Sequence, residues 1–166
     1  MNNEKLENLL NLALNATPEE REKSLELNVG YDTASRSWEV IVKASGGFDL
    51  LPELEQKGKK FDVVILDPPA FTKSRSSIKN AVKGYREINL RGMKLVKDGG
   101  YLATCSCSHF MDPELFTKTI REAAANVHKR LRQVEYRTQA ADHPILWAAD
   151  ESYYLKFIIF QVVDEK

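Results

Sequence analysis

The fold of this chain is decided by the stretch Phe61-Asp62-Val63-Val64-Ile65-Leu66-Asp67-Pro68-Pro69-Ala70-Phe71. Its first six residues are mostly β-branched or aromatic and predict a strand that is buried on both faces of a parallel sheet. Ligands bind beyond the carboxyl ends of such strands, which makes the following Asp67 a candidate site residue. The paired prolines stiffen the backbone and expose its carbonyl groups, although a rigid turn with no further role would use the same residues.

The sequence around this strand alternates between predicted helices and strands, which is typical of an α/β protein with a mostly parallel sheet. We expect helices on both faces of the sheet and an antiparallel last strand. The expected helices span 48–57, 78–96 and 112–131, and the expected strands span 61–67, 101–108, 133–137 and 153–163. Ahead of them we expect helices at 4–15 and from 17 onward and a strand at 38–44, so that 1–46 is a segment separate from a domain over 47–166.

The net charge of zero hides a strong partition along the chain. Of its 24 basic and 24 acidic residues, 1–56 holds 5 basic and 11 acidic ones, whereas 57–137 holds 17 basic and 8 acidic ones. The basic residues are densest between Lys73 and Lys97, where Glu87 is the only acidic one. This pattern is expected of a protein that meets an anionic partner with one face, although a solvated helix face would also account for it.

The two cysteines stand in Cys105-Ser106-Cys107, a spacing too short for a good disulfide. Side chains two apart on a strand lie about 7 Å from each other, which argues against a zinc site that also uses His109. We expect Cys105 to be buried and inert, and Cys107, nearer the end of the strand, to be a candidate nucleophile. No signal peptide or bilayer-spanning apolar run is evident, so we expect a soluble cytoplasmic protein.

Two further side chains have the chemistry of a binding site. Phe71 offers a flat surface on which a ring can stack. His143 could act as an acid, a base or a phosphate contact, or equally as a loop cap.

From about Phe48 to Val163 the chain resembles the C-terminal half of the bacterial S-adenosylmethionine-dependent 23S rRNA cytosine-5 methyltransferases. The resemblance rests on several motifs in the right order. They are 61–71, Gly84-Tyr85-Arg86-Glu87-Ile88-Asn89, Cys105-Ser106-Cys107-Ser108, Gln139-Ala140-Ala141-Asp142-His143-Pro144 and Tyr154-Leu155-Lys156. It implies part of a Rossmann-like class I methyltransferase fold, with S-adenosylmethionine as the cofactor and large-subunit rRNA as the partner.

The resemblance also implies roles for individual residues. Cys107 would attack C6 of the cytosine, and Asp67 would hydrogen-bond the polar edge of the ring. Asp67 and Pro68 would also contact the cofactor. The remaining substrate contacts would be Pro68, Pro69, Phe71, Tyr85 and His143, with Lys73 and Arg75 on RNA phosphates. The base must be flipped out of its stack or unpaired to be reached.

The chain departs from this family in its first third. The family's Gly-x-Gly cofactor loop is absent, and Gly46-Gly47 is the only glycine pair in the first 60 residues. Residues 4–44 resemble a leader segment of bacterial subtilisin-like proteases, which implies a mosaic or truncated chain whose strand at 38–44 replaces the one that normally precedes Phe48. The alternative function is therefore a non-catalytic remnant that keeps RNA binding. Methylation of guanine or protein is disfavoured by Cys107, and an open sheet edge would allow a homo-oligomer.

Overall fold

The structure, a computed structural model, describes residues 27–30, 39–42, 47–72 and 74–165. It divides into two compact units after residue 49. In the first unit, β1 (Leu27–Gly30) and β2 (Glu39–Val42) form an antiparallel pair. The strand expected at 38–44 is therefore present as β2. Within the described residues it pairs with β1, and the replacement of the strand before Phe48 stays a prediction. The helices expected before residue 27 lie outside the described residues.

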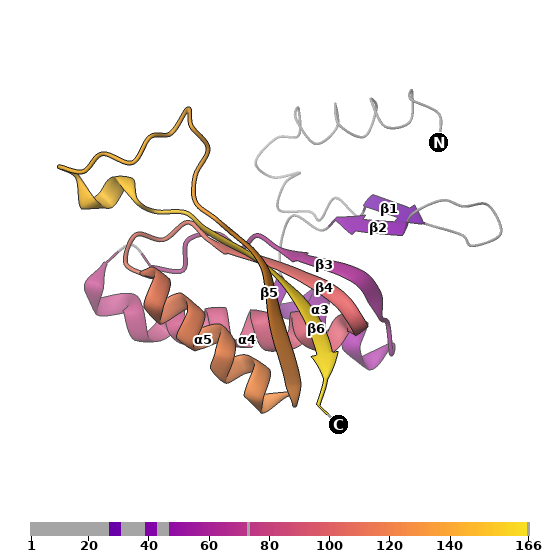
Figure 1. Cartoon of the computed structure of the whole chain (residues 1–166). Helices are drawn as coiled ribbons and strands as arrows, with labels where there is room; N and C mark the ends of the chain where they lie inside the picture. Colours follow the sequence, from indigo (N-terminus) through magenta and orange to yellow (C-terminus); the bar gives the residue numbers. More distant parts are fainter. Residues whose placement is uncertain (1–26, 31–38, 43–46, 73, 166) are drawn as a thin grey trace. The chain divides into compact units, whose positions relative to one another are not determined.

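The second unit is built on a four-stranded sheet with the order β3-β4-β6-β5 (Figure 1). Its strands are β3 (Phe61–Leu66), β4 (Val96–Ser106), β5 (Lys129–Arg137) and β6 (Lys156–Asp164). β3 and β4 are parallel, and β6 runs antiparallel to both of its neighbours, β4 and β5. Three strands thus share one direction, which confirms the mostly parallel sheet and the antiparallel last strand.

Among the described residues, three α-helices are present: α3 (Gly47–Gln56), α4 (Ile78–Leu95) and α5 (Pro113–Asn126). The bounds of α3 and α4 match the expected helices. α5 begins as expected, since the carboxylate of Asp112 accepts a hydrogen bond from the backbone N–H of Leu115 at 2.7 Å. It ends earlier than expected, because His128 takes a left-handed conformation with φ of 52° and β5 begins at once. None of the described helices has the length and apolar character needed to cross a bilayer.

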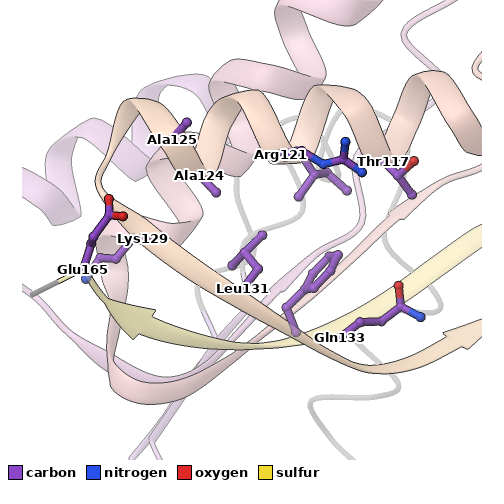
Figure 2. Close-up of a pocket in the computed structure, with 10 residues that line it drawn as sticks. Thr117, Arg121, Ala124, Ala125, Lys129, Leu131, Gln133 and Glu165 are labelled. Atoms are coloured by element: carbon purple, nitrogen blue, oxygen red, sulfur yellow. The ribbon is translucent and has the colours of Figure 1, made fainter.

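A shallow pocket lies between α5 and β5 (Figure 2). Its polar lining comes from Thr117 and Arg121 on the helix, from Lys129 and Gln133 on the strand, and from Glu165. None of the predicted site residues lines it, so the pocket is separate from the site that the sequence predicts.

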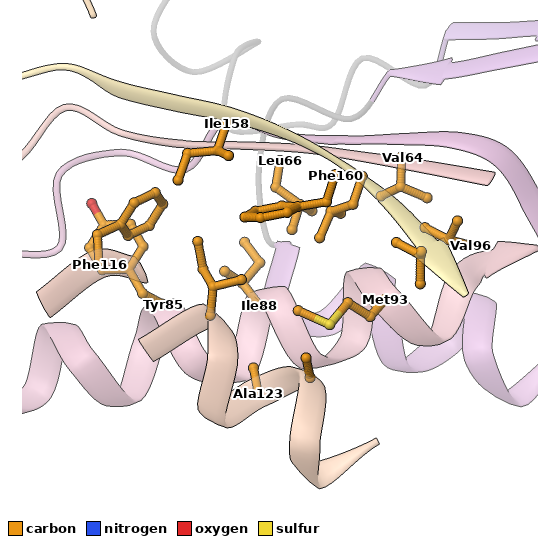
Figure 3. Close-up of a cluster of buried hydrophobic side chains, with 14 of the residues drawn as sticks. Val64, Leu66, Tyr85, Ile88, Met93, Val96, Phe116, Ala123, Ile158 and Phe160 are labelled. Atoms are coloured by element: carbon orange, nitrogen blue, oxygen red, sulfur yellow. The ribbon is translucent and has the colours of Figure 1, made fainter. Parts of the chain in front are cut away.

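The hydrophobic core lies between the sheet and the helices α4 and α5 (Figure 3). Alternate residues of β3 point into it: Val64 and Leu66 are buried, whereas Val63 and Ile65 are 49% and 71% exposed. The expectation that this strand is buried on both faces is therefore wrong for the described residues. Among the described residues, α4 and α5 pack against each other and against the same side of the sheet. The largest buried core residues are Tyr85, Met93, Leu95, Val96, Leu102, Met111, Phe116, Ile120, Ile158 and Val162.

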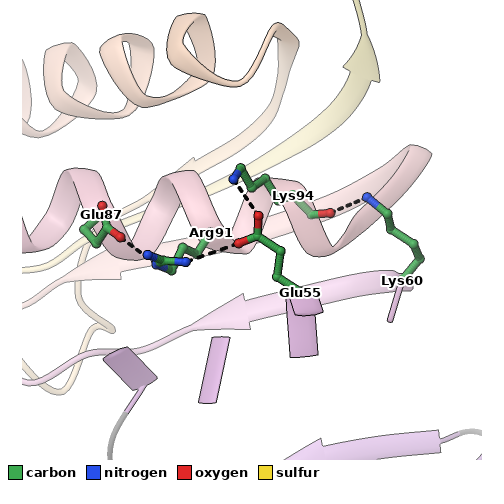
Figure 4. A network of polar contacts seen from close by, with 5 residues as sticks. All are labelled: Glu55, Lys60, Glu87, Arg91 and Lys94. Atoms are coloured by element: carbon green, nitrogen blue, oxygen red, sulfur yellow. Dashed lines mark hydrogen bonds and ion pairs between the residues drawn. The ribbon is translucent and has the colours of Figure 1, made fainter. Parts of the chain in front are cut away.

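A polar network joins α3 to α4 (Figure 4). The Glu55 carboxylate accepts hydrogen bonds from Lys94 at 2.5 Å and from Arg91 at 3.2 Å, and Arg91 also donates to Glu87 at 2.5 Å. The amine of Lys60 donates to the carbonyl group of Lys94. The hydrogen bond from Lys94 is the main reason why the pKa of Glu55 is lowered from its usual value.

A lowered carboxyl pKa predicts how stability changes with pH. Glu55 stabilises the fold while it is ionised, and this contribution is lost as the pH falls through its folded-state pKa. Glu55→Gln should lower the free energy of unfolding at pH 7 by less than about 1 kcal/mol, because the pairs are partly exposed. The difference from the unchanged protein should shrink in urea titrations as the pH falls below the usual glutamate pKa, and it should vanish below the lowered folded-state pKa of Glu55.

The matched control is Glu53→Gln, since the Glu53–Lys57 pair is more than half exposed. It should have the smaller effect at pH 7. Equal effects of the two changes would show that the network contributes no more than a surface pair.

Candidate active site at the carboxyl ends of β3 and β4

The predicted catalytic residues lie at neighbouring strand ends. β3 and β4 are parallel, and Leu66 pairs with Thr104 near the end of each strand. Asp67 follows β3 directly and Cys107 follows β4 directly, and both residues are exposed. The parallel pairing thus places a carboxylate and a thiol at the same edge of the sheet.

Asp67 is tied to β4 through the other cysteine. The thiol of Cys105 donates to the Asp67 carboxylate over 3.0 Å, and it lies 3.4 Å from the carbonyl oxygen of Leu66. Burial, and next the hydrogen bond to Asp67, raise the pKa of Cys105 far above its usual value. Cys105 is therefore a buried neutral thiol that positions Asp67. Its burial was predicted, but its contact with Asp67 was not.

Cys107 stands between two buried residues, Ser106 and Ser108, whose hydroxyl groups both form hydrogen bonds. The Ser106 hydroxyl donates to the Tyr85 hydroxyl over 2.9 Å and accepts from the backbone N–H of Ser108 at 3.3 Å. The Ser108 hydroxyl donates to the carbonyl of Thr72 over 3.0 Å. Since its two neighbours are fixed, the Cys107 side chain is presented to solvent from an ordered turn.

The Asp-Pro-Pro loop is partly buried. Pro68 is buried and Pro69 exposed, while the half-buried Phe71 ring meets the Tyr85 ring edge-on with centroids 4.6 Å apart. The absence of a side chain at Gly84 makes room for Phe71, because a β-carbon there would lie 3.2 Å from its ring. Phe71 is thus packed against α4 along one part of its surface.

Tyr85 was predicted to contact the substrate, but the structure places it in the core with 0% exposure. Its ring packs edge-on against Phe116 as well as Phe71. Burial raises its pKa, so the hydroxyl is neutral and serves as a hydrogen-bond partner of Ser106. The helical spacing of Ala81, Tyr85 and Ile88, all buried, is the pattern that would have indicated this inward position.

Lys156, for which no role is predicted from the sequence, is buried beneath the site with 1% exposure. Its amine donates to the carbonyl of Ser108 at 2.6 Å and to that of Tyr154 at 2.7 Å. Burial lowers its pKa to about 8. The sequence did carry an indication: Lys156 takes an inward position in a strand whose other inward residues, such as Ile158 and Phe160, are apolar.

The basic residues near the site fall into two groups. Arg91, Lys94 and Lys97 are engaged in ion pairs with Glu55, Glu87 or Asp62. Within the described part of the chain, no ion pair forms at the exposed residues Arg75, Lys79 and Lys83, which lie in the short 3-10 helix η1 (Arg75–Ser77) and the first turns of α4. Lys73 lies outside the described residues.

His143 lies in the segment that connects β5 to β6 and extends away from the sheet in Figure 1. Its side chain is 64% exposed, and its ring nitrogen lies 3.9 Å from the carboxylate of Asp142. The described contacts of His143 do not include Asp67 or Cys107.

Comparison with solved structures identifies the architecture. A solved structure described as "a putative methyltransferase complexed with SAH" matches 70% of this chain and 30% of its own length, with a TM-score of 0.59 and 18% identity. This is part of a class I methyltransferase fold. The site described above occupies the carboxyl ends of two neighbouring strands of that methyltransferase fold, where such sheets bind ligands.

Curated relatives are similar over the same part of the chain. "Ribosomal RNA large subunit methyltransferase I" of Alteromonas mediterranea is 41% identical over 118 residues, which cover 71% of this chain and 30% of that protein. A protein of Methanocaldococcus jannaschii named "Putative ribosomal RNA large subunit methyltransferase" is 38% identical over 152 residues, covering 92% of this chain and 34% of that protein. The chain therefore spans about a third of the length of these relatives.

The first part of the chain matches a different family. The family model of the Csp protease B prodomain matches residues 4–67. This supports the predicted resemblance of 4–44 to a protease leader segment and extends the match through β3 to Asp67.

The groups around Asp67 suit one side of a cofactor site. The exposed Asp67 carboxylate and the backbone carbonyls of the Asp-Pro-Pro loop are acceptors, which fit the amino and hydroxyl groups of a nucleoside-bearing amino acid. The glycine turn that would hold the other side is not found in the sequence, in which Gly46-Gly47 is the only glycine pair before β3.

The different burial of the two cysteines predicts selective chemistry. Iodoacetamide should modify Cys107 in the folded protein and leave Cys105 intact, because Cys105 is buried with a raised pKa. Peptide mass spectrometry after brief labelling at pH 8 measures both sites. In urea both cysteines should react, and equal labelling of the two in the folded protein would contradict the described site.

Proposed function

We propose that this chain carries the catalytic half of an S-adenosylmethionine-dependent RNA methyltransferase that modifies C5 of a cytosine in large-subunit rRNA. The observation that carries the proposal is the placement of Asp67 and Cys107 at adjoining ends of the parallel strands β3 and β4. The names and the identity of the two curated relatives support rRNA as the substrate.

In the proposed reaction, the Cys107 thiolate adds to C6 of the cytosine and forms a sulfur–carbon bond. The electron pair displaced to C5 then takes a methyl group, which the bound cofactor supplies from its sulfonium centre. Loss of the C5 proton and cleavage of the bond to Cys107 restore the aromatic ring and release the product. Asp67 holds the polar edge of the ring and stabilises charge as the adduct forms.

The surroundings of the two residues serve this chemistry. The rigid Asp-Pro-Pro loop and Phe71 hold the base, which must be unpaired or flipped to reach Cys107. The thiol of Cys105 donates a hydrogen bond to one oxygen of the Asp67 carboxylate. The other oxygen of Asp67 can then accept a hydrogen bond from the base. A methyl transfer to an exposed nitrogen would need no nucleophilic cysteine, which favours a carbon acceptor over guanine or protein nitrogen.

RNA would approach along the beginning of α4. Arg75, Lys79 and Lys83 are exposed and, among the described residues, form no ion pair, so they can meet phosphates without breaking an internal contact. Lys73, which lies outside the described residues, stays a predicted RNA contact. His143 stays a predicted substrate contact, supported by its exposure on the β5–β6 connection.

The proposal is tested by trapping the covalent adduct. RNA from the large subunit that contains 5-fluorocytidine should, with S-adenosylmethionine, form a complex that survives denaturing electrophoresis. It survives because C5 then bears a fluorine and no proton, so the ring cannot expel Cys107. Calorimetry with S-adenosylhomocysteine, run in parallel, should show saturable binding of one equivalent.

Two cysteine variants control the trapping experiment. Cys107→Ala should abolish the adduct, whereas Cys105→Ser, which keeps a donor for Asp67, should retain it. A folded chain that does not bind S-adenosylhomocysteine and forms no covalent adduct with the RNA would overturn the proposal. Retention of ordinary RNA binding in that case would identify the chain as the non-catalytic remnant.

The RNA surface gives a separate prediction. Lys79→Ala and Lys83→Ala should each weaken RNA binding by about three- to tenfold at 0.1 M salt. Each should also lower the slope of log affinity against log salt by about 1, since one phosphate contact is lost. Fluorescence anisotropy with an rRNA fragment measures both quantities.

Lys97→Ala removes the same charge from a side chain that is bound to Asp62 at 2.8 Å, and it is the matched control. It should change the affinity by less than twofold. An equal loss in all three variants would show that only the total charge matters and that the beginning of α4 is not the contact surface.

The remaining predictions concern assembly and location. β3 ends the described sheet, and its unpaired edge would allow the predicted homo-oligomer. We infer a cytoplasmic location from the proposed rRNA substrate.

A further inference from the structure

The connection between β5 and β6 exposes a cluster of apolar side chains. Ile145, Leu146 and Trp147 are 41%, 56% and 99% exposed, and the connection extends away from the sheet in Figure 1. The three residues are consecutive, so they form one continuous apolar stretch and are not scattered singly over the surface. Exposure of an indole ring to water is unfavourable, and such a stretch is typical of a contact with another molecule.

Hydrogen bonds hold the backbone on either side of Trp147. The Ser152 hydroxyl accepts from the backbone N–H of Leu146 at 2.7 Å and donates to the carbonyl of the same residue over 3.2 Å. The backbone N–H of Ala149 donates to that carbonyl at 2.9 Å, which closes a turn around Trp147. Trp147 is therefore presented from a defined turn, and this lowers the entropic cost of binding a partner.

The charges of this connection indicate what kind of partner it suits. Residues 138–155 include Asp142, Asp150 and Glu151 but neither lysine nor arginine. Asp150 and Glu151 are exposed and closely follow Trp147 in the chain. Carboxylates repel phosphate groups, and surfaces that bind RNA are basic. The cluster therefore suits a protein surface that is both apolar and basic better than it suits RNA.

The pocket between α5 and β5 offers apolar contacts for a ring (Figure 2). Its volume is about 380 Å³, which lies in the range of pockets that take ring-bearing ligands. Its apolar lining includes Ile120, Ala124 and Phe160, which are buried, and Leu131, which is partly buried. An indole ring would thus contact the helix on one side and the strands on the other.

Arg121 supplies positive charge to this pocket. The other charged lining residues are paired: Lys129 contacts Asp164, and Glu165 contacts Arg130 at 3.7 Å. Arg121 is exposed and forms no ion pair within the part of the chain that the structure describes. A carboxylate that enters beside an indole ring could therefore pair with Arg121 without breaking an internal contact.

We propose that copies of this chain associate through these two surfaces. Trp147 of one copy lies in the α5–β5 pocket of the next, and Asp150 or Glu151 pairs with Arg121 there. Since Trp147 is 99% exposed, it does not fill the pocket of its own chain. Both halves of the contact are present in one sequence, which makes a second copy the partner. The contact joins two different surfaces and uses neither the open edge of β3 nor the candidate active site.

Sedimentation velocity of the full chain tests this contact. Measurements run from about 5 to 500 µM, because one anchor residue gives a weak interface, and the mean mass should rise with concentration. Trp147→Ala and Arg121→Glu should each raise the dissociation constant by at least about tenfold. Both side chains are exposed, so neither change disturbs the core. A chain that stays monomeric over the whole range would overturn the proposal.

Two control variants change exposed residues elsewhere. Ile65→Ala removes an apolar side chain that is 71% exposed on β3, and Lys59→Glu reverses the charge of an exposed lysine ahead of that strand. Each should leave the dissociation constant within about twofold of the unchanged chain. A loss with Ile65→Ala as large as that with Trp147→Ala, or with Lys59→Glu as large as that with Arg121→Glu, would overturn the proposal.

A mixture of the two interface variants gives a further test. Trp147→Ala keeps an intact pocket, and Arg121→Glu keeps an intact tryptophan turn, so a pair made of one of each holds one complete contact. An equimolar mixture should therefore associate more strongly than either variant alone. A mixture that sediments as the separate variants do would overturn the proposal.

RNA binding distinguishes the other class of partner. At concentrations where the chain is monomeric, Trp147→Ala should bind an rRNA fragment with the affinity of the unchanged chain. A loss of RNA affinity without any change in sedimentation would overturn the proposal and identify the cluster as an RNA contact. The sedimentation experiments need neither RNA nor cofactor. Absence of the 5-fluorocytidine adduct would thus overturn the proposed function and leave the association of copies unaffected.

Discussion

The parallel pairing of β3 with β4 is the constraint on which the site depends. It brings Asp67 and Cys107, which are distant in the sequence, to one edge of the sheet. α4 supports this pairing at Gly92, where a β-carbon would lie 2.8 Å from Leu66 and 3.3 Å from Leu102. The glycine lets the helix approach both strands closely. The pairing of the two strands is therefore supported by close packing on the buried face of the sheet.

A polar layer lies between this packing and the surface. Tyr85, Ser106, Ser108 and Lys156 are all buried, and hydrogen bonds join them into one connected group beneath Cys107. Buried polar groups destabilise a fold unless they find partners, so such a layer admits few alternative arrangements. We consider this the physical reason why the exposed Cys107 is held in one place while its neighbours are inaccessible.

The basic residues between Lys73 and Lys97 do not all have the same role. Towards the end of α4, Arg91 and Lys94 are used to join the helix to α3 through Glu55. Nearer the site, Lys79 and Lys83 remain exposed at the beginning of the helix. One continuous run of basic residues thus has a structural part and a part that can meet an anionic partner, and only the second supports the proposed RNA surface.

The sequence by itself determined the local elements and the candidates for chemistry. Strand propensity and the Asp-Pro-Pro sequence located β3 and Asp67, and the position of Cys107 nearer the end of its strand distinguished it from the buried Cys105. Tertiary structure alone decided which charges are paired, that Tyr85 supports the site from within, that Cys105 holds Asp67, and that Lys156 lies beneath Cys107. These contacts join residues that are 21 to 48 positions apart. Propensity and periodicity describe near neighbours along the chain, whereas such contacts depend on the strand order and register that form only when the whole sheet is assembled.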